Sequence, residues 1–140
     1  MLMHRRRLLA VAPAATLASV VRQRRALAQA ASGPFRLPFI GPFSGPIGIV
    51  GQPALTGAQF TVEEINRAGG IMGRPLELVV RDAQGKPELA AAAAQELAAG
   101  GLHLLIAGLS TPEGLAVMPI MKSTNSVQIL LAGSGTVWKY

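Results

Sequence analysis

The chain has 140 residues, of which 50% are hydrophobic and 14% are charged. This length suits one modest domain, and the apolar content excludes a disordered chain, since disordered chains are poor in apolar residues. The absence of cysteine excludes disulfides, lipid anchors and cysteine-based metal sites or nucleophiles. The formal net charge of +6 arises in the first 25 positions, which hold six arginines and no acidic residue. Because the rest of the chain is neutral, we expect no nucleic-acid partner.

Residues 1–30 have the pattern of a signal peptide. A basic start that contains Arg5, Arg6 and Arg7 precedes an uncharged, largely apolar run over residues 8–21. This run is shorter than the roughly 20 residues that cross a bilayer, and small residues at 26–30 offer A-x-A cleavage patterns. We therefore predict export to the periplasm, with an amphipathic membrane helix or a start-site artefact as alternatives.

Two details of this segment favour the twin-arginine export route. Paired arginines directly precede the apolar run, and Arg22, Arg24 and Arg25 lie between that run and the cleavage patterns. Positive charge between the apolar run and the cleavage site disfavours the general secretory route. However, Leu8 and Leu9 follow the paired arginines where a phenylalanine is more usual. Both export routes therefore stay open.

From residue 35 onward, strand patterns alternate with helix patterns. Glycine pairs at 69–70 and 100–101 are typical of helix ends, and Pro87 suits a first helical turn. The order β-α-β-α-β-α-β predicts an α/β fold with a parallel, Rossmann-like sheet and right-handed crossovers. We predict strands over residues 36–43, 76–81, 102–107 and 127–131, and helices over about 53–68, 87–99 and 113–122.

Three loops of glycine and small polar residues are predicted to reach one edge of this sheet. They span residues 44–51, 108–112 and 132–136. In open parallel sheets, ligands bind outside the carboxyl ends of the strands, where these loops would lie. The sequence ends nine residues after the last strand pattern, so we expect an interrupted protein whose final strand lacks a covering helix.

A spaced series of motifs runs through the first half of the predicted domain. It comprises GPFSGP at 41–46, Gly51, TGA at 56–58, EINRAGGI at 64–71, GRPL at 73–76 and Asp82. The series resembles the opening of the substrate-binding proteins of branched-chain amino-acid ABC importers, the leucine/isoleucine/valine-binding protein family. KPELA at 86–90 is similar to the Asp-Pro-x-x-Ala of this family, with Lys86 in place of the aspartate. The resemblance implies that residues 31–140 form the truncated first lobe of a type 1 periplasmic binding fold.

The resemblance also implies where a solute would lie. Family members trap the solute between two hinged lobes, and the loop after the third strand gives hydroxyl and amide groups to the ligand carboxylate. Ser110 and Thr111 match this loop, and they precede a helix whose N-terminus would favour an anion. The alternative is that Ser110 or Thr111 only caps that helix.

Two further loops carry residues that the resemblance assigns to the ligand. Gly133, Ser134 and Thr136 match the loop after the fourth strand, with a register open by one residue, and a plain glycine turn is the alternative. Val50 stands where the family often has an aromatic residue, which leaves the solute unidentified. The acid that pairs with the ligand ammonium in the family belongs to the second lobe.

Other kinds of site are not supported by the sequence. Gly45, Gly48 and Gly51 fit neither the Rossmann nor the P-loop motif, and Pro46 removes an amide donor that a phosphate loop would use. His103 lies in an apolar strand pattern, and we expect a satisfied core residue there. We therefore expect no enzyme activity, no metal and no cofactor.

The sequence thus predicts the solute-binding component of an ABC importer for amino acids or related small solutes, with a membrane permease as partner. Two alternatives stay open. The chain is a remnant that no longer binds, because half of the ligand cleft is missing. Less favoured is a small nucleotide-binding α/β domain.

Overall fold

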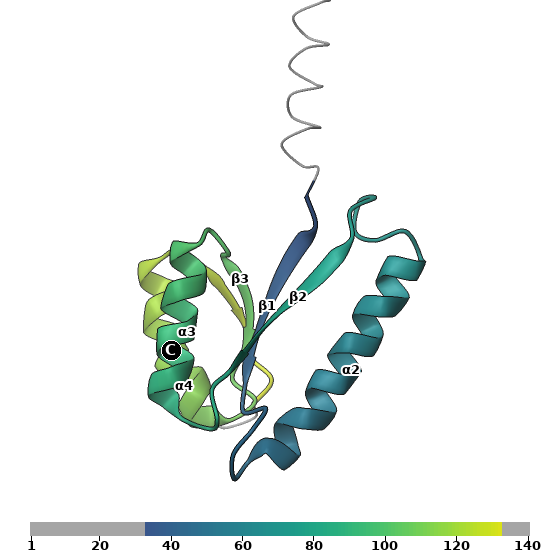
Figure 1. Ribbon diagram of the computed structural model, residues 1–140. Helices are drawn as coiled ribbons and strands as arrows, with labels where there is room; N and C mark the ends of the chain where they lie inside the picture. Colours follow the sequence, from purple (N-terminus) through teal and green to yellow (C-terminus); the bar gives the residue numbers. More distant parts are fainter. Residues whose placement is uncertain (1–32, 133–140) are drawn as a thin grey trace, which may run out of the picture. The chain divides into compact units, whose positions relative to one another are not determined.

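The computed structural model describes residues 33–132, in which strands and helices alternate strictly (Figure 1). The four strands are parallel and lie in the order β2-β1-β3-β4. The predicted α/β class and element order are therefore confirmed. The elements are β1 (Phe35–Gly41), α2 (Gly48–Arg67), β2 (Leu76–Asp82), α3 (Pro87–Ala99), β3 (Leu104–Ala107), α4 (Thr111–Ser123) and β4 (Val127–Ile129).

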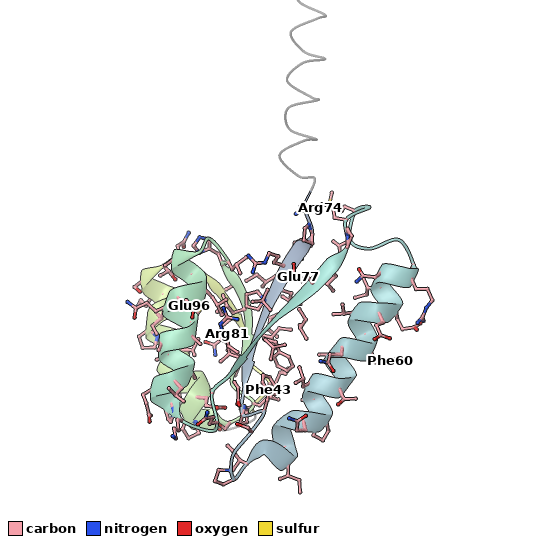
Figure 2. All side chains as sticks on the ribbon, viewed as in Figure 1. Phe43, Phe60, Arg74, Glu77, Arg81 and Glu96 are labelled. Atoms are coloured by element: carbon pink, nitrogen blue, oxygen red, sulfur yellow. The ribbon has the colours of Figure 1, made fainter. Side chains whose placement is uncertain are left out.

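Helices α3 and α4 pack beside each other on one face of the sheet, which we call the closed face (Figure 1). Ala90 and Ala94 of α3 are fully buried one turn apart, so the helix backbone can approach its neighbours closely. At the rim, the Arg81 guanidinium donates to the Glu96 carboxylate of α3 at 2.8 Å (Figure 2). The core on this face consists of Ile40, Val79, Ala83, Ala90, Ala94, Leu97, Leu105, Ala107, Val117 and Met121.

Helix α2 lies on the opposite face, which we call the open face, and packs mainly on β2 (Figure 1). The Asn66 side chain fixes the end of α2 to the start of β2. Its Nδ2 donates to the Leu76 carbonyl at 2.8 Å, and the Leu76 amide donates to Asn66 Oδ1 at 2.6 Å. On the same face, Leu104 of β3 and Val127 and Ile129 of β4 stay exposed. The two faces are therefore covered unequally.

The first helix begins earlier than the sequence predicted. Helix α2 starts at Gly48 instead of near Pro53, which lies inside the helix. The turn that leads into it is tight, because the Gly48 amide donates to Gly45 and the Val50 amide to Ile47, both at 3.1 Å. The fixed φ of proline is compatible with a helix, although one backbone donor is lost. β1 in turn ends at Gly41, two residues before its predicted end.

The later boundaries also differ by a few residues. β3 begins at Leu104 because the amide of Leu102 donates to the Leu97 carbonyl at 3.0 Å and so belongs to the end of α3. Helix α4 begins at Thr111, two residues early, and β4 ends at Ile129, two residues early. These shifts keep every element and its type.

The prediction that His103 is a core residue is wrong. His103 is exposed just before β3, and its Nδ1 lies 2.8 Å from Ser126 Oγ. This hydrogen bond lies at the edge of the sheet where the strands begin. In the part of the chain that the structure describes, no helix has the length and apolar character needed to cross a membrane.

Candidate functional site

The carboxyl ends of three strands lie at one level of the sheet. Gly41 of β1 pairs with Asp82 of β2, and Ile40 pairs with Ala107 of β3. The segments that follow these strands therefore start from one edge, which we call the carboxyl edge. It is the edge at which the sequence predicted a ligand.

Asp82 organises the loop that follows β1. Its Oδ1 accepts hydrogen bonds from the amides of Phe43 at 2.9 Å, Ser44 at 3.2 Å and Gln84 at 2.9 Å, and the Ser44 hydroxyl donates to Oδ2. Burial raises the pKa of Asp82, but the hydrogen bonds from the Ser44 hydroxyl and from the three amides outweigh it, so the pKa lies below its usual value. A carboxylate thus holds this loop against β2.

Helix α2 holds the same loop from the other side. A Cβ on Gly51 would lie 2.0 Å from the Pro42 carbonyl oxygen, so only glycine allows the helix to approach this closely. The Gln52 side chain donates to the Phe43 carbonyl, and the Phe43 ring packs edge-on against Phe39 with centroids 5.0 Å apart. The loop is therefore fixed on both flanks.

Val50 lies in the first turn of α2, whereas the sequence analysis placed it in a loop. Its side chain is 56% exposed, and Ile49 beside it is more exposed still. The start of α2 follows the loop that Asp82 holds, so Val50 lies near the carboxyl edge. An apolar and accessible surface is thus present there, as a contact with an apolar solute group would require.

The start of α4 is packed tightly against the end of β3. Gly108 has a φ of +89°, and a Cβ there would lie 2.7 Å from Gly114 Cα and 2.3 Å from Leu130 Cδ1. Ser110 occupies the N-cap position in an extended conformation, and its carbonyl accepts the Gly114 amide at 3.0 Å. Thr111 is the first residue of α4. Both predicted site residues on this loop therefore lie at the carboxyl edge.

The Ser110 hydroxyl does not cap the helix in the expected way. No backbone amide of α4 donates to it, and it instead donates to Glu113 Oε2 at 2.8 Å. Glu113 is fully buried, and the sequence analysis did not select it. A signal was available, because a glutamate three residues after a serine at a helix start is the capping-box pattern.

The last group of predicted site residues lies outside the described residues. Gly133, Ser134 and Thr136 belong to this group, and their assignment to the ligand stays a prediction. Between residues 33 and 132, no cluster of three or more histidine, aspartate or glutamate side chains could hold a metal ion. The donors and acceptors described at the carboxyl edge are hydroxyls, amides and carboxyl groups.

A parallel α/β sheet whose carboxyl edge carries a fixed polar loop and a helix N-terminus defines a lobe of the ligand-binding α/β class. The family model described as periplasmic binding protein matches residues 34–139. The chain therefore belongs to the periplasmic binding protein family, as the resemblance in its motifs predicted.

Individual relatives agree with this assignment. The chain is 25% identical over 114 residues to the Leu/Ile/Val-binding protein BraC3 of Rhizobium johnstonii, a match that covers 81% of this chain and 31% of that protein. It is 36% identical over 70 residues to the Leu/Ile/Val-binding protein of Escherichia coli, covering 50% of this chain and 19% of that protein. The chain thus spans less than a third of the length of these curated relatives.

Solved structures show the same fold. The branched-chain amino acid transporter substrate-binding protein LivJ of Streptococcus pneumoniae, in complex with isoleucine, matches with a TM-score of 0.69 and 23% identity, over 76% of this chain and 31% of that chain. A periplasmic binding protein of Burkholderia mallei matches with a TM-score of 0.65 and 30% identity, over 74% of this chain and 28% of that chain. The fold is that of one lobe of a type 1 periplasmic binding protein.

Proposed function

We propose that this chain supplies the first lobe of an extracytoplasmic solute-binding protein that delivers amino acids of the branched-chain type, or related small solutes, to an ABC permease. One observation carries the proposal: the loop held by Asp82 and the start of α4 share the carboxyl edge of a parallel sheet. Membership of the periplasmic binding protein family supports it, as do relatives named for leucine, isoleucine and valine.

The solute contacts in this proposal come from three places. Ser110 and Thr111 offer hydroxyl and amide groups at the start of α4, and Val50 offers apolar surface at the start of α2. The predicted contribution of Gly133, Ser134 and Thr136 completes the set. The aliphatic Val50 offers less contact surface to a solute side chain than the aromatic ring that the family often has there.

A solute panel tests the proposal. A ligand that binds only the folded state raises the melting temperature, so we expect leucine, isoleucine or valine to raise that of the purified chain. We expect the double variant Ser110→Ala with Thr111→Ala to lose the shift, and Ser123→Ala at the far end of α4 to keep it. If no solute stabilises a folded chain, the remnant alternative is favoured, and a shift with ATP or ADP alone would favour the nucleotide-binding alternative.

We propose in addition that residues 1–30 are a signal peptide that is removed on export to the periplasm. The basic start, short apolar run and A-x-A patterns support this, as does the periplasmic character of the family. We expect mass spectrometry of the periplasmic fraction to find a mature chain that begins after Ala28 or Ala30. The double variant Arg6→Lys with Arg7→Lys preserves charge, so blocked export would identify the twin-arginine route and unchanged export the general one. An unprocessed chain in the cytoplasm would contradict the signal peptide.

A further inference from the structure

A cavity lies at the edge of the sheet where the strands begin, which we call the amino edge. It measures about 450 Å³, is open to solvent, and is lined by residues from the start of β1, the turn before β2 and the segment that leads into β3. Phe35 pairs with Leu76, so β1 and β2 start at one level. The volume falls within the range of small-molecule sites, roughly 300–1,000 Å³. The cavity is separate from the carboxyl edge, where the proposed solute contacts lie.

The polar wall of this cavity is basic. Arg36 comes from β1, Arg74 from the turn before β2 and His103 from the segment before β3. Among the described residues that line the cavity, none is acidic. A concave surface that carries charge of one sign attracts ligands of the opposite sign. The planar guanidinium group also matches the oxygens of phosphate and carboxylate groups. The wall is therefore suited to an anion.

Arg74 is held in place by a short turn. Its amide donates to the Ile71 carbonyl at 3.0 Å, and the Ile71 amide donates to the Arg74 carbonyl at 2.8 Å. Its Nη2 donates to the Pro34 carbonyl at 3.2 Å, which places the side chain beside the start of β1 (Figure 2). A guanidinium group has five N–H donors, so it can hold Pro34 and an anion together. A side chain that is already fixed loses less freedom when a ligand binds.

The other two basic side chains are also able to reach an anion. Arg36 Nε lies 3.8 Å from Glu77 Oε2, and both side chains are about half exposed. Exposed ion pairs contribute little, so Arg36 can turn towards a ligand at little cost. His103 Nδ1 lies 2.8 Å from Ser126 Oγ, which leaves Nε2 as the ring nitrogen that can meet a ligand.

The end of α3 lies beside the cavity and opposes an anion only weakly. A helix C-terminus carries the equivalent of about half a negative charge. Here the amides of residues 100–102 donate to the last carbonyls of the helix, each at 3.0 Å, so these carbonyls are already paired. Two full guanidinium charges on the wall exceed this partial charge. The potential in the cavity is therefore set by the arginines.

The rest of the wall is apolar. Phe35 and Leu102 are half-buried, and Leu104 is 37% exposed. Apolar surface beside cationic groups favours an anion that carries an apolar part over a bare ion. Three basic groups from three separate segments also suit a head group with three oxygens. A phosphate monoester has three terminal oxygens, whereas a carboxylate has two.

We propose that the amino edge carries a second binding site, in which the three basic side chains hold the head group of an organic phosphate monoester and the apolar wall contacts its carbon skeleton. The phosphate group can belong to a soluble ester or to the head group of a lipid. The inference does not depend on the proposed function, because none of its residues lies at the carboxyl edge.

The first test uses phenyl phosphate, which combines a phosphate monoester with an apolar ring. It is titrated into the isotope-labelled chain in a phosphate-free buffer, and the amide resonances of residues 35–36 and 101–104 are followed by NMR. We expect saturable shifts there, and weaker binding of inorganic phosphate. Arg36→Gln should weaken the binding of phenyl phosphate about tenfold. Arg67→Gln is the matched control and should bind as the wild type, because Arg67 also pairs with a glutamate but does not line the cavity.

A second variant separates charge from geometry. Arg74→Lys keeps the positive charge but loses the planar fork, so we expect binding about threefold to tenfold weaker than in the wild type. If this variant fails to fold because the bond to Pro34 is lost, the wild type and Arg36→Gln still decide the question. Absence of saturable shifts at the cavity in the wild type, or equal affinity in Arg36→Gln, would overturn the site. Inorganic phosphate that binds as tightly as phenyl phosphate would overturn the role of the apolar wall.

A third titration distinguishes the two sources of the phosphate group. Dihexanoyl phosphatidic acid is added below the concentration at which it forms micelles, and the same resonances are followed. Saturable shifts that weaken in Arg36→Gln would identify a lipid head group as a ligand. Shifts with phenyl phosphate alone would identify a soluble ester. Either result upholds the site, and binding of neither compound would overturn it.

Discussion

The two faces of the sheet are built from the same strands but are covered very differently. Leu105 on the closed face is fully buried, whereas its neighbour Leu104 on the open face is 37% exposed. Val127 and Ile129 of β4 are 59% and 43% exposed on the open face. Near-continuous apolar runs are typical of parallel strands that are covered on both faces. The closed face therefore holds a core of its own, whereas the open face has the sequence of a surface that is meant to be covered.

The largest expected effect comes from the core of the closed face. Leu105→Ala removes a fully buried side chain and leaves a cavity, so we expect the free energy of unfolding to fall by about 3 kcal/mol. The matched change Ile129→Ala on the open face should lower it by less than about 1 kcal/mol, since that side chain is already half in water. Urea unfolding followed by circular dichroism measures both. Equal losses would contradict the distinction between the faces.

The glycine at the start of the α4 loop should show the next largest effect. Gly108→Ala places a Cβ against Leu130 and Gly114 and strains a positive φ, so we expect a loss of about 2 kcal/mol or more. Gly101 has a similar φ of +80° but open space around it, so Gly101→Ala should cost only about 1 kcal/mol. The difference between the two variants isolates the packing of α4 against the carboxyl end of β3. A loss that is the same in both would show that backbone strain alone matters.

A smaller effect should come from Asp82 at the carboxyl edge, as a dependence of stability on pH. The pKa of Asp82 is lower in the folded chain than its usual value, so its stabilising contribution is present above the unfolded pKa of about 4 and is lost as pH falls through the folded pKa. Glu96 on the closed face also has a lowered pKa, through its hydrogen bond with Arg81. We therefore expect Asp82→Asn to reduce, but not abolish, the loss of stability as the pH falls below about 5. An identical pH profile in the variant would rule out Asp82 as a contributor.

The smallest change in stability should come from the exposed residues of β4. In the double variant Val127→Thr with Ile129→Thr, we expect a change within about 0.5 kcal/mol. Self-association should nevertheless decrease, because exposed apolar patches drive contacts between molecules. Light scattering as a function of protein concentration measures the self-association, with Leu89→Gln on α3 as the control. Unchanged self-association would show that the chains do not associate through the open face of β4.

The sequence predicted the order of the elements but not every boundary. Alternating apolar runs and glycine pairs are local signals, and they predicted the parallel sheet correctly. The start of α2 depends on the fit of Gly51 against Pro42, and the start of β3 depends on the bond from Leu102 back to α3. Such tertiary contacts leave no local pattern, so these boundaries could not be predicted.

The candidate site shows the same limit. The position of Ser110 and Thr111 at the start of α4 was predictable because a polar loop before a helix is visible in the sequence, whereas their contact with a solute stays a prediction. Asp82 was part of the family resemblance, but its four hydrogen bonds follow from the register of β1 with β2. The burial of Glu113 was not predictable, because glutamate in a first helical turn is usually exposed and only the packing of α4 shows which stripe faces the core.

Asn66 has a consequence for how the sheet ends. Its side-chain amide gives Leu76 one donor and one acceptor, the same pair of groups that a neighbouring strand would present. β2 is an outer strand of the sheet, so its outward backbone groups could pair with a strand of another molecule. The Asn66 side chain occupies the first of these groups, those of Leu76, and so blocks pairing there. An asparagine on a helix thereby protects one border of the sheet by imitating a piece of backbone.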